Sequence, residues 1–362
     1  MAKIRKFLKR KDIHFSLKRY GIDALGAMAQ GLFCTLLVGT ILNTLGQMGV
    51  GFLNEIVVTV KQGENTLSYT VGGLASAMVG PGIAVAIGMA LKAPPLVLFS
   101  LIPVGFAANA MGGAGGPLAV YFVAIVAVEC GKLVSKETKI DILVTPVVTT
   151  LAGVGVAALI AAPIGKAASA VGEFVEWATI LQPFWMGILV SVSVGIALTL
   201  PISSAAICAA LGLTGLAGGA AVAGCCAQMV GFAVMSFREN RWGGLVAQGI
   251  GTSMLQMPNI IKNPRIWIPP ILCSAITGPL ATCLFHLEMN GAPVSSGMGT
   301  CGFVGQIGIY TGWITTGHPI SAMDWIGLTL ICFILPGMIS WLIALPLRRW
   351  GWIGGNDLKL DL

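Results

Sequence analysis

The sequence predicts an all-α polytopic integral membrane protein. Of its 362 residues, 56% are hydrophobic and only 10% carry a charge, whereas about a quarter of the residues in a soluble globular chain are charged. The mean hydropathy is +0.88, and long apolar stretches recur along the chain. The nine cysteines are scattered in apolar surroundings without Cys-x-x-Cys spacing, so we expect small buried side chains and neither a metal site nor a disulfide framework.

Residues 1–20 form a basic, roughly amphipathic segment. Eight basic residues lie between Lys3 and Arg19 against one acid, Asp12, and large apolar side chains are interleaved with them. Such a segment suits the surface of an anionic cytoplasmic leaflet, so membrane lipids are its expected partners. An arm that binds nucleic acid is the alternative, but because an apolar span follows at once we expect no nucleic-acid partner.

The apolar stretches that follow are separated by short polar or glycine-rich segments. The glycines at 112–116 predict a helix break, and the aromatic and charged residues mixed at 165–182 predict a separate interfacial helix. Residues 243–257 and 302–313 are candidates for re-entrant segments. About ten transmembrane helices remain, with eight spans plus re-entrant segments as the alternative. They are expected near residues 24–48, 71–91, 96–111, 117–129, 140–160, 184–200, 205–217, 220–237, 269–285 and 325–345.

The distribution of positive charge predicts the orientation of these helices. In the ten-helix arrangement, only Lys61 and Lys166 of the 21 lysines and arginines fall outside the cell. Because positive residues accumulate in cytoplasmic loops, both termini are expected in the cytoplasm. We expect a single membrane domain over residues 21–350 and a polar cytoplasmic tail at residues 351–362.

Two parts of the chain resemble each other. Residues 85–94, Val-Ala-Ile-Gly-Met-Ala-Leu-Lys-Ala-Pro, are similar to residues 192–201, Val-Ser-Val-Gly-Ile-Ala-Leu-Thr-Leu-Pro, at an offset of 107. A pair of glycines follows each stretch, at 115–116 and at 218–219. Chance similarity between apolar segments is the alternative, but the shared order of features favours an internal repeat. In secondary transporters that contain repeats, the substrate usually binds where the repeats meet.

Residues 286–306 are the most polar stretch deep in this apolar chain. They contain a histidine, a carboxylate and two amides, and the five glycines and one proline make a continuous helix unlikely to form. Irregular backbone in a membrane is tolerated where protein buries it or where it lines a water-filled cavity. The stretch therefore predicts a binding-site loop, with a plain external connection as the alternative.

Three motifs resemble a known family. They are Gly-Ala-Pro-Val-Ser-Ser-Gly-Met-Gly-Thr-Cys-Gly at 291–302, Lys-Ile-Asp-Ile-Leu-Val-Thr-Pro-Val-Val at 139–148 and Met-Pro-Asn-Ile-Ile at 257–261. They are similar to the membrane (IIC-type) subunits of the sugar phosphotransferase system and, more narrowly, to the stand-alone perfringolysin-regulator-like branch. The resemblance implies a protein of the bacterial plasma (inner) membrane, a homodimer and a central sugar site.

The chain also departs from that family. The Gly-Ile-Thr-Glu-type loop, whose carboxylate orients the sugar hydroxyl in phosphorylating permeases, is absent from the sequence. A soluble domain needs on the order of 100 residues, and no polar stretch approaches that length. We therefore expect no enzymatic activity, no catalytic residue and no cofactor in this chain. Any phosphoryl transfer would require separate soluble phosphocarrier subunits.

A sugar offers hydroxyl groups, so the resemblance implies a site of carboxylate, amide and hydroxyl side chains. Glu288 is the strongest candidate, because a carboxylate near lipid usually faces a cavity or a partner; an ionised group at the membrane edge is the alternative. Local capping is the alternative for the hydroxyls, and an interfacial position is the alternative for the histidine. The expected substrate-binding residues are Glu288, Asn290, Ser295, Ser296, Thr300, Asn109, His286 and Gln306.

These observations predict a permease-like protein that binds and translocates a small polar solute such as a sugar. The cavity is expected between the 286–306 loop and residues 105–116, and transport is expected to proceed by alternating access. A membrane-bound regulator is the alternative: it would bind the solute and signal through residues 1–20 without transport. An ion channel is disfavoured because the sequence contains no filter-like motif.

Overall fold

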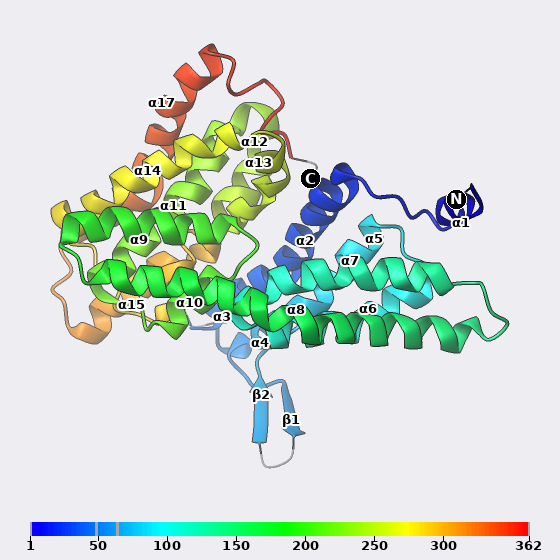
Figure 1. The fold of residues 1–362 in the computed structure, drawn as a ribbon. Helices are drawn as coiled ribbons and strands as arrows, with labels where there is room; N and C mark the ends of the chain where they lie inside the picture. The colour runs from blue at the N-terminus through cyan, green and yellow to red at the C-terminus, as the bar shows by residue number, and fades with distance from the viewer. Residues whose placement is uncertain (1, 48–49, 63–64, 361–362) are drawn as a thin grey trace. The chain divides into compact units, whose positions relative to one another are not determined.

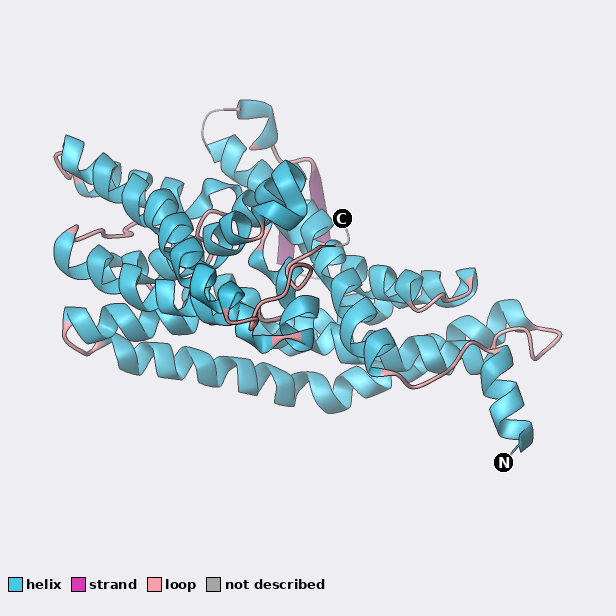
Figure 2. Ribbon diagram, turned by 90° about the horizontal axis from the view of Figure 1, so that it is seen from above, coloured by secondary structure: helices cyan, strands magenta, loops and turns pink. Residues whose placement is uncertain are grey.

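Apolar helices dominate the computed structural model, which describes residues 2–47, 50–62 and 65–360 (Figures 1 and 2). Six helical segments are long and apolar enough to cross a membrane, or seven if the bent pair α4 (Val71–Ala77) and α5 (Val79–Ala90) is one span. This confirms the prediction of an all-α polytopic membrane protein. The expected number of about ten spans is not confirmed.

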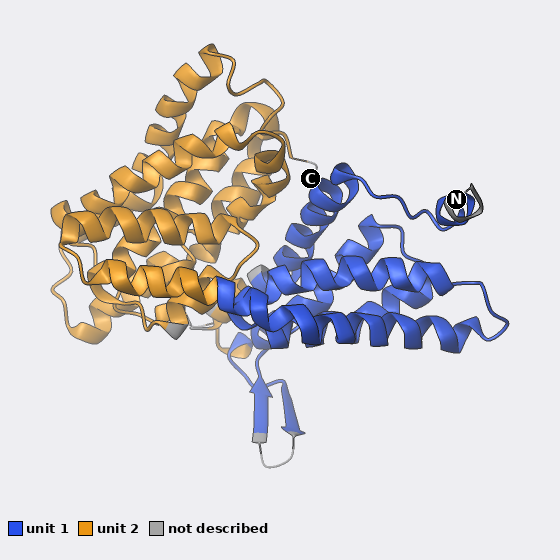
Figure 3. Cartoon of the chain, in the orientation of Figure 1, with its two compact units in different colours: residues 1–39, 53–167 blue, residues 40–52, 168–362 orange. Residues whose placement is uncertain are grey.

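The chain divides into two compact units (Figure 3). Unit 1 comprises residues 1–39 and 53–167, and unit 2 comprises residues 40–52 and 168–362. The two similar stretches of sequence fall one in each unit. Each includes the end of a helix, α5 in unit 1 and α9 (Pro183–Thr199) in unit 2. The internal duplication itself stays a prediction.

Helical turns continue from residue 18 to residue 47, and π-helical turns alternate with α-helix along this rod. Close to its middle, Gly31 lies against Gly82 of α5, where an added Cβ would be 2.6 Å from the Gly82 carbonyl oxygen. Small residues allow such close helix packing in membranes. The amino-terminal elements are α1 (Ala2–Arg10), η1 (Lys18–Asp23), α2 (Ala24–Leu32), η2 (Phe33–Leu37) and α3 (Val38–Gln47).

The predicted glycine break is confirmed. Helix α6 (Pro95–Gly112) ends at Gly113, whose φ of +51° lies in the left-handed region that glycine adopts without steric cost. After the 3₁₀ turn η4 (Gly113–Gly115), helix α7 (Gly116–Val134) returns along α6, so that Gly131 lies against Val97. The apolar stretch from residue 95 to residue 134 is therefore a helical hairpin.

The prediction of a separate interfacial helix at residues 165–182 is wrong. One helix, α8 (Asp141–Thr179), runs through 39 residues and contains Pro146 and Pro163 in its interior. Alanines surround Pro163, and alanine is the strongest helix former. Membrane helices also tolerate proline. At about 1.5 Å per residue the helix is roughly 58 Å long, well beyond a bilayer core of about 30 Å.

A β-hairpin, which the sequence analysis did not anticipate, lies in the polar segment before α4. Strand β1 (Val58–Gln62) pairs antiparallel with β2 (Asn65–Tyr69), and Val60 stands opposite Leu67. Valine, threonine and tyrosine favour strands. The short 3₁₀ turn η3 (Gly51–Leu53) precedes the hairpin.

Unit 2 is built around α11 (Gly215–Met235), which is buried along most of its length. Helices α9, α14 (Ile268–Pro279) and α17 (Leu335–Arg349) pack against it. Gly224 of α11 lies so close to Ser191 of α9 that a Cβ would overlap with the Ser191 carbonyl.

The remaining elements of unit 2 are α10 (Ser204–Ala210), α12 (Phe237–Val246), η5 (Ala247–Gly251), η6 (Ser253–Gln256), α13 (Met257–Lys262), η7 (Pro264–Trp267), η8 (Leu280–Leu284), η9 (Pro293–Gly297), η10 (Cys301–Phe303), α15 (Val304–Thr316), α16 (Ala322–Thr329) and η11 (Leu330–Ile334).

The carboxy-terminal residues are fastened to unit 2. The side chain of Leu358 is completely buried. Its carbonyl oxygen accepts hydrogen bonds from Asn240 Nδ2 at 2.7 Å and Gln256 Nε2 at 3.0 Å. The carbonyl of Lys359 accepts a third bond, from Asn259 Nδ2 at 2.8 Å. The tail therefore supplies backbone partners to three amide side chains.

The nine cysteines are all free thiols. Six are buried, as expected for small apolar side chains, whereas Cys34 and Cys283 are exposed and Cys130 is half-buried. The prediction of burial is thus correct for most of them and wrong for Cys34 and Cys283.

Candidate functional site

The 286–306 segment has the irregular backbone that its glycines predict. His286, Gly299, Gly302 and Phe303 all have positive φ, between +44° and +59°. Two short 3₁₀ turns, η9 and η10, lie between them, and helix α15 begins only at Val304. We call residues 286–303 the central loop. Its non-helical centre is confirmed.

Backbone contacts hold the first part of the central loop against the start of α11. Gly215 and Met289 exchange N–H···O bonds of 2.9 and 3.0 Å. One turn further along α11, Gly219 leaves just enough room for the carbonyl oxygen of Leu287. Glycine at this position allows the loop to lie directly on the helix backbone.

Side-chain hydroxyls fasten the second part of the loop. Ser296 Oγ donates to the Leu213 carbonyl at 2.6 Å, and Ser204 Oγ of α10 donates to the Gly297 carbonyl at 2.7 Å. Both serines are buried. A buried hydroxyl needs such a partner, because leaving it unpaired costs about 1–3 kcal/mol. These bonds make the loop a fixed part of unit 2.

Glu288, which is exposed, and Asn290, which is half-buried, form a hydrogen-bonded polar pair on the central loop. Asn290 Nδ2 donates to Glu288 Oε2 at 2.8 Å, and Asn290 Oδ1 accepts from the Gly215 backbone N–H at 3.1 Å. The carboxylate of Glu288 is exposed, while Leu287 and Met289 on either side are buried. Because buried and exposed side chains alternate over residues 287–289, the Glu288 side chain points away from unit 2 while its backbone is held in place. Its carboxylate is therefore accessible.

The other loop candidates lie inside the unit. Ser295, Ser296, Thr300 and Gln306 are all buried. Thr300 Oγ1 lies 3.6 Å from the sulfur of Met229, and Gln306 Nε2 lies 3.4 Å from the sulfur of Cys226. Among the described residues, Gln306 Oε1 has no hydrogen-bond partner.

The last two candidates are His286 and Asn109. His286 is exposed at the beginning of the loop and has no bond to Glu288, in agreement with their separation of two residues. Asn109 belongs to α6 of unit 1, where it is half-buried and packs closely against Gly116. The structure thus joins Glu288 to Asn290 directly and places the buried hydroxyls in the support of the same loop.

A buried polar cluster in unit 2 was missed by the sequence analysis. Gln228, the one amide on α11, accepts hydrogen bonds from Trp267 Nε1 at 2.8 Å and Thr199 Oγ1 at 3.2 Å. Its Nε2 lies 3.4 Å from Ser274 Oγ, and Thr199 Oγ1 lies 2.8 Å from Ser253 Oγ. The available signal was a lone glutamine in an apolar helix, which in a membrane requires a polar partner.

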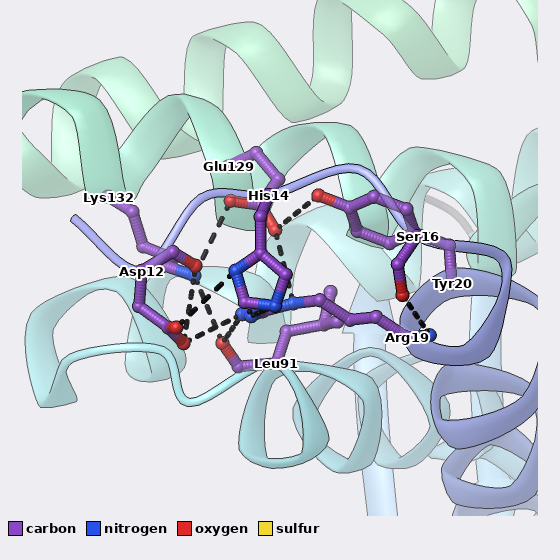
Figure 4. A network of polar contacts seen from close by, with 8 residues as sticks. All are labelled: Asp12, His14, Ser16, Arg19, Tyr20, Leu91, Glu129 and Lys132. Carbon is purple, nitrogen blue, oxygen red and sulfur yellow. Dashed lines mark hydrogen bonds and ion pairs between the residues drawn. The ribbon is translucent and has the colours of Figure 1, made fainter. Parts of the chain in front are cut away.

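The amino-terminal segment of unit 1 contains a second unexpected cluster (Figure 4). Arg19 Nη2 donates to Asp12 Oδ2 at 3.0 Å and to the Leu91 carbonyl at 2.7 Å. Lys132 Nζ donates to the carbonyls of Asp12 at 2.7 Å and Leu91 at 3.1 Å. These bonds tie residues 12–19 to the ends of α5 and α7.

An acid on α7 completes this amino-terminal ion cluster. Glu129 Oε2 lies 3.4 Å from Lys132 Nζ, and Glu129 Oε1 accepts a hydrogen bond from Tyr20 Oη at 2.9 Å. Closer to the chain terminus, Arg10 and Lys11 both form ion pairs with Glu137, at 2.6 and 2.5 Å. The segment expected to lie on the lipid surface is therefore packed against unit 1 from Arg10 onwards.

Acid pH should weaken the attachment of this segment. The hydrogen bond from Arg19, aided by the charges of Arg19 and Lys132, holds the pKa of Asp12 below its usual value. A carboxyl group with a lowered folded-state pKa contributes stability above its unfolded pKa of about 3.9 and loses it as the pH falls through the folded value. We expect Asp12→Asn to lower the thermal unfolding midpoint at pH 5–7, and the difference from the native protein to vanish in stronger acid.

Unfolding midpoints measured from pH 7 down to pH 3 test this expectation. Asp23→Asn is the matched control, because Asp23 is exposed and has no ion pair among the described residues. A difference between Asp12→Asn and the native protein that stays constant down to pH 3 would contradict the role given to the Asp12 carboxylate.

The helical units and the anchored polar loop define a polytopic membrane protein with a polar site held by apolar helices. Comparison with known families gives its class. The family model described as phosphotransferase system, EIIC matches residues 22–360, and the chain belongs to this family. No curated protein matches the chain, and no solved structure does.

Membership of the EIIC family determines the general role, the location and the substrate class of the protein. Members of the family are membrane transporter subunits of the sugar phosphotransferase system and are not themselves catalytic. Together with the apolar helices, this places the protein in the bacterial inner membrane and gives it a sugar as the class of substrate.

Proposed function

We propose that the protein binds a sugar at the central loop and translocates it, with Glu288 and Asn290 as the residues that contact the sugar. The observation that carries this proposal is the hydrogen-bonded Glu288–Asn290 pair. Glu288 is exposed and Asn290 is half-buried, and the backbone that carries them is bound to α11 through Gly215. A site needs such prior positioning, because ordering a loose loop on binding weakens affinity.

The chemistry of this pair suits a polyhydroxyl ligand. The carboxylate of Glu288 accepts hydrogen bonds from sugar hydroxyls, and bonds to a charged group contribute about 1.5–3 kcal/mol. Asn290 has its carbonyl oxygen occupied by the Gly215 N–H, so its amide orientation is fixed and its Nδ2 points at the carboxylate. We assign Ser295, Ser296, Thr300 and Gln306 to the support of the loop, because all four are buried.

The remaining features of the transport model are proposals as well. The chain would act as a homodimer with both termini in the cytoplasm. It would move the sugar by alternating access. Separate soluble phosphocarrier subunits would supply the phosphoryl group if the sugar is phosphorylated during entry.

Sugar binding by Glu288→Gln tests the site. Equilibrium binding to the detergent-purified protein should be measured across a panel of sugars and sugar phosphates. The substitution keeps the shape and removes the charge, so we expect the affinity for the sugar that binds to fall about ten- to hundredfold. Glu173→Gln is the matched control, because Glu173 is exposed on α8 and lies outside the loop. Unchanged affinity in Glu288→Gln would place the site elsewhere.

A regulator without transport activity, of the perfringolysin-regulator-like kind, is the second candidate. The observation in its favour is the amino-terminal segment, which could report a change in unit 1. Asp12 and Arg19 of this segment form ion pairs with Lys132 and Glu129 of α7. Uptake separates the two functions. Cells that produce the protein should accumulate the bound sugar if it is a permease. A sugar that binds the purified protein with Glu288-dependent affinity but never accumulates would favour the regulator.

A further inference from the structure

A groove with apolar walls lies where α11, α12 and α17 come together in unit 2. Val234 of α11, Leu245 of α12 and Trp341 and Leu345 of α17 line it. Its volume is about 550 Å³, within the range of about 300–1,000 Å³ that is common for small-molecule pockets. Trp341 is 47% exposed, so the groove is open along the side of α17.

Three arginines, Arg238, Arg241 and Arg348, also line this groove. Arg348 is neutralised, because its Nη1 lies 2.7 Å from Glu239 Oε1 and its Nη2 donates to the Met235 carbonyl at 2.9 Å. Arg238 and Arg241 are exposed, and within the described chain neither has an acidic partner. Two positive charges therefore remain uncompensated beside an apolar groove.

The backbone at Arg241 is strained. Its φ of +51° and ψ of −149° interrupt α12. A non-glycine residue in such a region costs on the order of 1–3 kcal/mol and persists where its surroundings fix it. Because glycine adopts positive φ without this cost, Arg241→Gly removes the guanidinium while relieving strain.

We propose that this groove binds an acidic phospholipid, with the phosphate at Arg238 and Arg241 and an acyl chain along the apolar wall. Guanidinium groups match the geometry of phosphate oxygens. A water-soluble anion would leave the apolar wall uncovered, whereas a phospholipid satisfies both parts of the groove. Basic pockets between membrane helices bind lipid headgroups in the same manner. The site is distinct from the central loop and is independent of the proposed sugar binding.

Lipid binding to the delipidated, detergent-purified full-length protein tests the proposal by native mass spectrometry. Phosphatidylglycerol, phosphatidylcholine and glycerol 3-phosphate are titrated separately. We expect phosphatidylglycerol to bind more tightly than the other two. The variant Arg238→Ala/Arg241→Gly should weaken its binding about twenty-five-fold, because each cation near an anionic headgroup contributes about fivefold.

Lys262→Ala/Arg349→Ala is the matched control. It removes the same charge from exposed positions of unit 2 that do not line the groove, and it should leave the affinity nearly unchanged. Equal weakening in both double variants would reduce the effect to general surface charge and overturn the proposal. Binding of glycerol 3-phosphate as tight as that of phosphatidylglycerol would also overturn it, by showing a site for soluble anions. Unfolding midpoints of both variants establish that each is folded.

Discussion

Gly219→Ala is expected to destabilise unit 2 by about 3 kcal/mol or more. The added Cβ would overlap with the carbonyl oxygen of Leu287, and the next nearest atom, 2.8 Å away, is the carbonyl carbon of the same residue. Because both are backbone atoms, no side-chain rotation can relieve the clash. Overpacking inside a core typically costs about 1–3 kcal/mol of folding free energy. Because this substitution also displaces the anchored loop, its cost should reach or exceed about 3 kcal/mol.

Size-exclusion profiles and unfolding midpoints of the purified variant test this expectation. Gly155→Ala in α8 is the matched control, because no atom lies within 4 Å of the position that its Cβ would occupy. Alanine there should be neutral or stabilising, since glycine in a helix costs about 0.5–1 kcal/mol relative to alanine. A native midpoint for Gly219→Ala would mean that the central loop does not lie on α11 as the structure shows.

Lys132→Met is expected to destabilise unit 1 by roughly 3–5 kcal/mol, the usual cost of removing one partner from a buried ion pair. Lys132 is 2% exposed and contacts two backbone carbonyls and Glu129. Methionine fills a similar volume, but among the described residues it leaves the Glu129 carboxylate with only Arg19 as a nearby cation, at 4.0 Å.

Unfolding measurements on the single and double variants separate charge from packing. In Lys132→Met/Glu129→Gln the acid is neutral as well, so the double variant should recover part of the stability lost by the single variant. Lys139→Met, at an exposed position, serves as the control and should behave like the native protein. A double variant less stable than Lys132→Met would show that Glu129 does not depend on Lys132.

Features encoded by neighbouring residues were predictable from the sequence. The glycines at 112–116 predict the turn between α6 and α7, and the glycines and proline of residues 286–306 predict an irregular loop. Both predictions depend on local backbone preferences, which the residues carry with them. The same reasoning fails at residues 165–182, where mixed aromatic and charged side chains predict a separate interfacial helix but helix α8 continues to Thr179.

The polar clusters could not be predicted, because their members come together only through packing. Lys132 reaches the Asp12 carbonyl across 120 positions of the chain, and Trp267 reaches Gln228 across 39. Hydrophobic periodicity and composition predict the type of a single helix or strand, but they do not predict which side chains of different elements meet. For the same reason, the sequence identified Glu288 and Asn290 as polar loop residues but could not show that Gly215 fixes the amide of Asn290.

The fastening of the carboxy-terminal tail has a consequence for synthesis of the protein. Asn240, Gln256 and Asn259 emerge from the ribosome about 100 residues before the carbonyls of Leu358 and Lys359 that they bind. Until Leu358 and Lys359 have been synthesised, these amides lack their final partners, and the buried position of the Leu358 side chain is unoccupied. Unit 2 can therefore complete its fold only after residues 358 and 359 have left the ribosome, well after α12 and α13 have been made.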